Sequence, residues 1–343
     1  MQPDRFEADL ERIRALPASP RSLAGPSNWL NGILLFADFV ASVPPRMSKL
    51  SSGWRAYPKD FKKVRFPSLD GIELVGWFGR STFPGPRPGL ILLPGLFTSK
   101  DNNRIRARSL RILREWGFHI LTLDLRGIGE SQRVRSTPGS KEADDIVAAI
   151  RWFENEAKPA PLHLYAESLA ASAALVAVGR EGKAGRELCS GRVLSVSPYA
   201  DPRPILERFS GRIDWSDFSL AGPKALFKVI LRMTGTGESE FDDYVANAAN
   251  DYNIPLDDLL RESTALEYIE HVRTPTAIIH SHDDAMVPVE HATSLVDRSN
   301  GNHAVRTVIL PWGNHCLYEM AEPDWYWKAL TVFFGAERST TNN

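Results

Sequence analysis

Short apolar runs that alternate with amphipathic helical patterns constrain the fold of this chain more than any other feature. The runs cover residues 90–93, 119–123, 162–166, 192–196, 276–279 and 305–310, and helical patterns cover residues 104–116, 143–153, 169–178, 289–296 and 325–334. Continuous apolar runs are typical of central parallel strands that helices cover on both faces. The alternation therefore predicts an α/β fold with a mostly parallel sheet flanked by helices.

Two segments depart from this alternation. Residues 64–69 and 72–78 flank an Asp70-Gly71 turn and predict a β-hairpin ahead of the parallel strands. Between Asp201 and Val272 no strand pattern occurs, so we expect a helical insertion over the sheet. The expected organisation is an N-terminal helical extension over 1–60, a core in two parts over 61–201 and 273–336, a helical cap over 202–272, and a disordered tail over 337–343.

The composition disfavours several classes of partner. The 343 residues include 41 basic and 42 acidic side chains, and a net charge of -1 gives no reason to expect nucleic acid or an anionic membrane as partner. Cys189 and Cys316 cannot make a disulfide framework, and no cluster has metal-ligand spacing. The N-terminal residues lack the pattern of a secretory signal. We therefore expect a cytoplasmic protein with a small, largely apolar ligand and no bound metal.

The most apolar segment of the chain, residues 29–43, lies in the N-terminal extension. It contains Asn31 and Asp38 and is shorter than the roughly 20 residues that a membrane-spanning helix needs. We expect a buried or cap-covering helix and no transmembrane segment. Docking to a membrane surface or a partner is the alternative, and a homodimer through this extension or the cap is another.

Ser168 stands at the junction between a predicted strand and an Ala-rich predicted helix. A sharp turn of this kind, a nucleophile elbow, exposes a serine hydroxyl at the N-terminus of the helix, where negative charge is stabilised. Only small residues fit two positions to either side, and Ala166 and Ala170 stand where Gly is usual. Taken alone, the pattern fits a structural serine in an ordinary strand-to-helix turn better than a nucleophile, so its interpretation depends on further motifs.

Two polar loops follow predicted neighbouring strands. The strand at 276–279 leads into a loop that contains Asp283 and Asp284, and the strand at 305–310 leads into a loop that ends in His315. Because the carboxyl ends of parallel strands meet at one edge of a sheet, these side chains are expected near the predicted elbow. An acid and an imidazole are the groups that a serine hydroxyl needs to become a nucleophile.

With these motifs the chain resembles the α/β-hydrolase superfamily over residues 64–335. Residues 124–131 are similar to its Asp-x-Arg-Gly-x-Gly-x-Ser turn, residues 94–96 (Pro-Gly-Leu) to its oxyanion loop, residues 280–288 to its His-Gly-x-x-Asp-x-x-Val-Pro acid loop, and residues 313–315 to its His loop. The chain departs from the pattern at Pro94, where many relatives have His, and at Ser281, where Gly is usual. The order Ser, Asp, His is that of the superfamily.

The resemblance implies a serine esterase or lipase-like enzyme that needs no metal or organic cofactor. Ser168 would be the nucleophile, His315 the base and Asp284 the orienting acid, with Asp283 as the alternative acid. Backbone N–H groups of Leu96 and Leu169 would form the oxyanion hole.

Phe97 and Glu167 are the residues expected beside the substrate. Phe97 and the cap suggest an apolar acyl pocket. Glu167 resembles the Glu of Gly-Glu-Ser-x-Gly carboxylesterases, and we expect it to support the nucleophile without reacting. Asp124 and Arg126 are expected to brace loops. Cleavage of a carboxylic ester is the first hypothesis; a thioesterase, a C–C hydrolase, an acyltransferase or a non-catalytic binding protein on the same fold are alternatives.

Overall fold

The computed structural model describes residues 3–19, 59–96, 98–211, 224–225, 228 and 240–336. The apolar segment at 29–43, the tail at 337–343 and Phe97 lie outside the described residues. None of the helices within these described ranges is long and apolar enough to cross a membrane.

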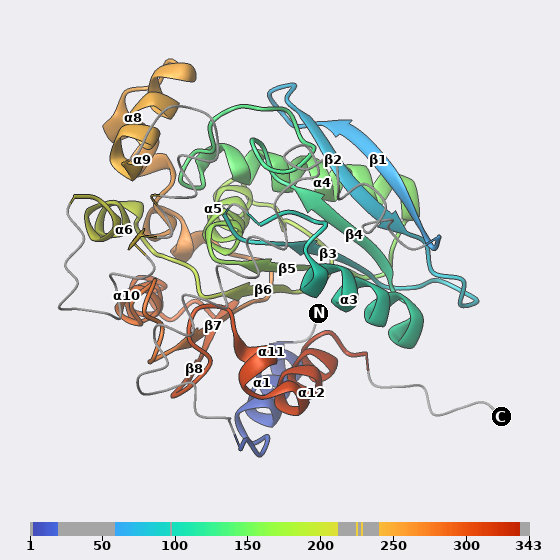
Figure 1. Cartoon of the computed structure of the whole chain (residues 1–343). Coiled ribbons are helices and arrows are strands. Elements are labelled where there is room, and N and C mark those ends of the chain that lie inside the picture. Colours follow the sequence, from blue (N-terminus) through green and yellow to red (C-terminus); the bar gives the residue numbers. More distant parts are fainter. Residues whose placement is uncertain are drawn as a thin grey trace.

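A sheet of eight strands lies at the centre of the described part of the chain, in the order β1-β2-β4-β3-β5-β6-β7-β8 (Figure 1). The strands are β1 (Phe61–Pro67), β2 (Glu73–Gly79), β3 (Gly89–Leu93), β4 (His119–Asp124), β5 (Leu162–Glu167), β6 (Val193–Val196), β7 (Thr276–Ser281) and β8 (Val305–Leu310). β2 pairs antiparallel with β1 and β4, and every other neighbouring pair is parallel. The predicted mostly parallel sheet and the predicted hairpin are therefore confirmed, and the hairpin lies at one edge of the sheet.

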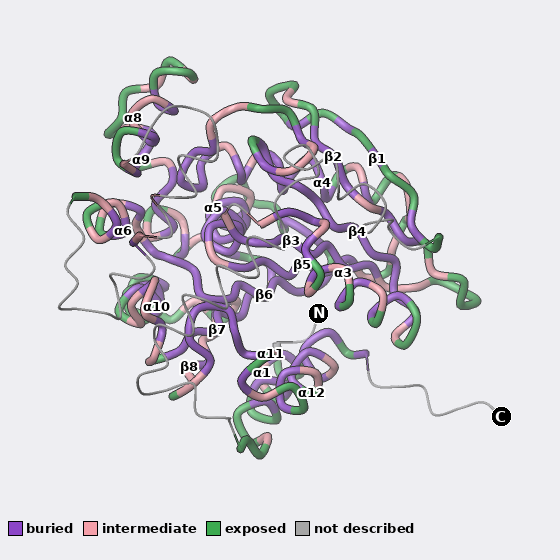
Figure 2. Tube along the Cα trace, in the orientation of Figure 1, coloured by how far each residue is buried: buried purple, intermediate pink, exposed green. Residues whose placement is uncertain are grey.

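Helices cover both faces of the sheet (Figure 1). One face carries α4 (Ser140–Ala157), α5 (Leu169–Lys183) and α10 (Glu290–Arg298), whereas the other carries α1 (Pro3–Arg14), α3 (Asn103–Arg111), its π-helical continuation η2 (Ile112–Trp116) and α12 (Pro323–Phe333). The central strands are buried along their length, as Figure 2 shows. This two-sided burial explains why these strands are continuous apolar runs.

Helix α1 is packed into the fold. Its residues Phe6, Leu10 and Ile13 are buried, and the Phe6 ring lies 6.2 Å from the ring of Phe333 on α12. Asp9 on the same helix lies 2.8 Å from Nη1 of the buried Arg192. Because a buried cation that loses its partner destabilises a protein, this pair ties α1 to the core.

Between β6 and β7, the described part of the chain contains helices and connecting loops but no strand. The helices are α6 (Pro202–Phe209), α8 (Phe241–Asp251), α9 (Leu256–Glu262) and the short helices η3 (Ala265–Glu267) and η4 (Ile269–His271). Tyr244 of α8 accepts a hydrogen bond of 2.8 Å from the backbone N–H of Ser136, in the loop between β4 and α4. This contact joins α8 to the core.

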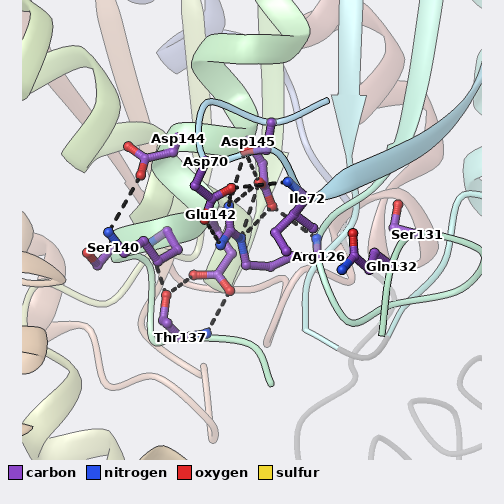
Figure 3. Close-up of polar contacts among 12 residues, drawn as sticks. Asp70, Ile72, Arg126, Ser131, Gln132, Thr137, Ser140, Glu142, Asp144 and Asp145 are labelled. Carbon is purple, nitrogen blue, oxygen red and sulfur yellow. Dashed lines mark hydrogen bonds and ion pairs between the residues drawn. The ribbon is translucent and has the colours of Figure 1, made fainter. Parts of the chain in front are cut away.

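Arg126 braces the turn after β4. Its buried guanidinium donates to Asp145 on α4 at 2.6 Å and to Asp70 in the hairpin turn at 2.7 Å, and Figure 3 shows it beside these two carboxylates. It also lies 3.1 Å from the hydroxyl of Tyr252, at the end of α8. Arg126 thus joins the hairpin, α4 and the helical insertion, which is the bracing role expected from the sequence.

Candidate active site

Ser168 lies in the tight turn between β5 and α5. Its backbone has φ 54° and ψ -121°, a conformation that is strained for any residue with a side chain. Its N–H donates to the carbonyl of Val196 at 2.9 Å, which holds the turn against β6. Ala166 and Ala170 are completely buried at the closest approach of strand and helix, while Ser168 itself remains partly exposed. The turn therefore presents the serine hydroxyl at the carboxyl edge of the sheet.

The loops after β7 and β8 bring two side chains to this hydroxyl. Oγ of Ser168 lies 2.9 Å from Nε2 of His315, and Nδ1 of His315 lies 2.9 Å from Oδ2 of Asp284. The imidazole is almost completely buried. The three residues expected to act together thus form one continuous chain of hydrogen bonds.

The carboxylate of Asp284 is held on several sides. Its Oδ1 accepts backbone N–H groups of Met286 at 3.0 Å and Val287 at 2.8 Å, and Nε2 of His280 lies 3.6 Å from its Oδ2. Burial alone would raise the pKa of Asp284, but the neighbouring His315 and these hydrogen bonds hold that pKa below its usual value. Asp284 is therefore an ionised, fixed acceptor for the imidazole N–H.

Asp283 contacts the backbone of the His loop. Its Oδ1 accepts the backbone N–H of Asn314 at 2.7 Å and contacts the hydroxyl of Ser281. The Asp283 carboxylate thus supports the backbone of the loop that carries His315. The carboxylate that contacts the imidazole is that of Asp284.

The oxyanion loop approaches the elbow closely. A Cβ atom on Gly95 would lie 2.9 Å from Cβ of Ser168, so only glycine fits at this position. Leu96 follows it, and Leu169 is the first residue of α5, where a backbone N–H has no partner within the helix. Both leucines line the same pocket as Ser168. The two residues that the resemblance assigns to the oxyanion hole therefore border the pocket at Ser168.

A pocket opens at Ser168 and His315. Its lining is almost entirely apolar and comes from α6, α8, the acid loop and several loops beside the elbow. The lining residues besides the reacting pair are Leu96, Pro138, Leu169, Tyr199, Pro202, Ile205, Leu206, Phe209, Phe241, Met286 and Val287. Most of these residues were not predicted from the sequence, because the sequence does not show which apolar residues of the insertion face the active site.

Glu167 lies apart from this pocket. Its buried carboxylate contacts Arg108 at 2.9 Å, Arg104 at 3.0 Å and the hydroxyl of Tyr165 at 2.7 Å. Burial alone would raise the pKa of Glu167, but the two arginines lower it to about 2. Glu167 is expected beside the substrate, but it does not line the pocket, and its carboxylate is held by its partners on α3 and β5.

Two further histidines near the site are held by backbone groups. Nε2 of His280 lies 2.8 Å from the carbonyl oxygen of Val287, and Nδ1 of His291 accepts the N–H of Ala200 at 3.1 Å. Burial lowers the pKa of both histidines. Within the described part of the chain, His, Cys, Asp and Glu residues form no group of three that could hold a metal ion.

The sheet order, the elbow and the carboxyl-edge position of the site define an α/β-hydrolase, and comparison with solved structures agrees. An esterase of Pyrococcus furiosus superposes with a TM-score of 0.59 at 18% identity, covering 80% of this chain and 91% of that one. A 2,6-dihydroxy-pseudo-oxynicotine hydrolase superposes with a TM-score of 0.61 at 16% identity, covering 99% and 89% of the two chains. At these identities the likeness shows the fold alone.

Within this class the chain belongs to the hydrolase family described as serine aminopeptidase, S33, whose profile matches residues 101–324. Among curated proteins it is similar to lysophosphatidylserine lipase ABHD12 of Danio rerio, with 24% identity over 226 residues, 64% of this chain and 49% of that protein. It is also similar to a polyketide transferase of Gibberella fujikuroi, with 35% identity over 92 residues, 26% and 28% of the two chains. The matches span about half or less of these relatives.

Proposed function

We propose that this protein is a serine hydrolase that cleaves carboxylic esters of largely apolar acids through an acyl-enzyme. One observation carries the proposal: the hydrogen-bonded chain Ser168–His315–Asp284 lies at the mouth of an apolar pocket. A hydroxyl, an imidazole and a carboxylate in this order are the groups that acyl transfer to serine requires.

In the acylation step, Oγ of Ser168 attacks the ester carbonyl carbon while Nε2 of His315 takes the hydroxyl proton. Asp284 fixes the tautomer of the imidazole and stabilises its cation. The oxyanion receives hydrogen bonds from the N–H groups of Leu96 and Leu169, each donor contributing roughly 3 kcal/mol to transition-state stabilisation. His315 then protonates the leaving alcohol, and the acyl group remains on Ser168.

In the deacylation step the same groups act on water. His315 takes a proton from a water molecule, whose oxygen attacks the acyl carbonyl carbon. Collapse of the tetrahedral intermediate returns the proton to Oγ of Ser168 and releases the acid. This half of the cycle needs no further group.

The pocket favours an ester over an aminopeptidase substrate. An aminopeptidase must bind the charged amino terminus of a peptide, and a buried cation needs an anionic or strongly polar partner. The described lining residues include neither a carboxylate nor a cation. An uncharged apolar acyl group matches this lining, and the similarity to a protein named as a lipase supports the same choice.

A substrate panel tests the proposal. We expect p-nitrophenyl esters of acetate, butyrate and octanoate to be hydrolysed with kcat/KM at least about 100-fold above that of leucine and alanine p-nitroanilides. Ser168→Ala is the control for background hydrolysis. Faster cleavage of the anilides would contradict the ester assignment.

The same panel separates the other chemistries of this fold. Acyl thioesters cleaved faster than the matching oxygen esters would identify a thioesterase. Transfer of the acyl group to an added alcohol, exceeding release of the free acid, would identify an acyltransferase. A folded protein that turns over none of these substrates would favour a C–C hydrolase or a non-catalytic binding protein.

A further inference from the structure

Arg104 lies where three loops of the candidate active site meet. It is the second residue of α3, the helix that follows the oxyanion loop. The buried side chain of Asn102 caps this helix and accepts the backbone N–H of Arg104 at 2.8 Å. The cap fixes the start of the Arg104 side chain relative to the oxyanion loop.

The guanidinium of Arg104 reaches the other two loops. Its Nη2 lies 3.0 Å from Oε2 of Glu167, and its Nη1 donates at 2.8 Å to the carbonyl oxygen of Cys316. Glu167 directly precedes Ser168, and Cys316 directly follows His315. One side chain thus bonds to the chain neighbours of both members of the Ser–His pair, which are 147 residues apart in the sequence.

The backbone at both ends of this bridge is strained. Ser168 has φ 54°, and the residues that flank His315 also lie in the left-handed region, with Asn314 at φ 43° and Cys316 at φ 59°. Non-glycine residues keep such conformations only where their surroundings fix them. A hydrogen bond to the Cys316 carbonyl is one such constraint, placed one residue from the imidazole.

The fold does not depend on Arg104 to neutralise Glu167. Arg108, one turn further along α3, donates to the same carboxylate at 2.9 Å, and the Tyr165 hydroxyl adds a third contact. Arg108 also pairs at 2.8 Å with Glu319 on α11 (Tyr318–Ala321). Arg104 therefore differs from Arg108 in its hydrogen bond to the carbonyl oxygen of Cys316.

We propose that Arg104 is a positioning residue that sets the alignment of Ser168 and His315 by joining the elbow to the His loop. The inference rests on the proposed function. A planar guanidinium serves two acceptors in fixed directions, whereas a lysine ammonium is a single point charge. Misplacement of reacting groups by about 1 Å can cost about 100-fold in rate, so the bridge should act on kcat.

Kinetics of Arg104→Gln and Arg104→Lys test this role. Arg106→Gln is the matched control, because Arg106 lies on the same helix and its side chain contacts the exposed Asn103 at 3.2 Å. For each variant, the active fraction is measured by complete labelling with a fluorophosphonate, followed by kcat, KM and the thermal midpoint. The labelling rate is a second readout, since it also requires His315 to accept the serine proton.

We expect Arg104→Gln to lower kcat per active site about 100-fold and to slow labelling in parallel, with KM within about 3-fold of wild type. Arg104→Lys should lose at least about 10-fold in kcat, and Arg106→Gln should match wild type. A purely structural role would instead lower the thermal midpoint or the active fraction and leave kcat per active site unchanged.

Wild-type kcat in both Arg104 variants, or a change in KM alone, would overturn the inference while the proposed function stands. If Arg104→Gln does not fold, Arg104→Lys decides, because it keeps a positive charge beside Glu167. A wild-type protein that neither labels nor turns over ester would contradict the proposed function, and the inference would fall with it.

Discussion

Oδ2 of Asp284 lies 2.9 Å from Nδ1 of His315, while the other oxygen of the same carboxylate accepts two backbone N–H groups of its own loop. Hydrogen bonds within its own loop thus fix the carboxylate independently of its contact with the imidazole. Asp283, one residue earlier, bonds to the backbone of the His loop instead. Two adjacent acids therefore have separable roles, one toward the imidazole ring and one toward the loop that carries it.

Substitution of the two acids should separate these roles. Asp284→Asn replaces the acceptor of the imidazole N–H and favours the wrong tautomer, so we expect kcat to fall by about 10⁴-fold. Asp283→Asn keeps an oxygen that can accept the N–H of Asn314, so its kcat should stay within about 10-fold. Ester hydrolysis at saturating substrate measures both, with circular dichroism as the control for folding. The reverse ranking would move the orienting acid to Asp283.

The buried Glu167 should make stability depend on acid pH. Two arginines hold its pKa at about 2 in the folded protein, against an ordinary value of 4.5. A carboxyl with a lowered pKa contributes stability that is fully present above about pH 4.5 and is lost as the pH falls toward 2. The free energy of unfolding of wild type should therefore fall more steeply over this range than that of Glu167→Gln, by up to about 1.4 kcal/mol per pH unit.

Urea unfolding at a series of pH values compares the two proteins. Glu167→Gln should be less stable than wild type at neutral pH, because it removes one of the two carboxylates that pair with the buried Arg108. The difference in the free energy of unfolding between the two proteins should become smaller as the pH falls from about 4.5 toward 2. Curves that stay parallel would show that Glu167 does not carry the lowered pKa.

The pocket should set the preference for acyl length. Leu206 on α6 lines the pocket and is only partly buried, so a larger side chain there can project into the apolar space. We expect Leu206→Trp to reduce kcat/KM for octanoate esters by about 10-fold or more and to leave acetate esters within about 3-fold. Glu207→Gln, exposed on the same helix, is the control. Equal losses for both esters would place the acyl chain elsewhere.

Sequence patterns predict the layers of this fold well because the spacing of apolar residues within each strand and helix reflects which of its faces are buried. The continuous apolar runs of β3, β4 and β5 reflect burial on both faces, and the polar loops after β7 and β8 follow from the parallel arrangement. Ser168, Asp284 and His315 can be selected from the sequence because their motifs follow predicted strands in a recognisable order. Asp284 and Asp283 can be separated only once the loop conformation is known.

Contacts between distant segments cannot be read from such patterns. The Arg104 guanidinium and the Cys316 carbonyl are 212 residues apart in the chain, and no local signal links them. Glu167 adjoins Ser168 and is therefore expected beside the substrate, but its carboxylate bonds to two arginines on α3 and does not line the pocket. The apolar pocket is likewise lined by residues of α6 and α8, which come together only in the folded protein.

The measurement that most directly tests the account is covalent labelling of Ser168. Wild type and Ser168→Ala are treated with a fluorophosphonate, and intact mass and the labelled peptide are determined. An activated serine at the elbow predicts one added phosphonyl group on wild type, located at Ser168, and none on Ser168→Ala, together with a loss of ester turnover of about 10⁴-fold or more. A folded wild type that stays unlabelled, or a label that persists in Ser168→Ala, would contradict the account.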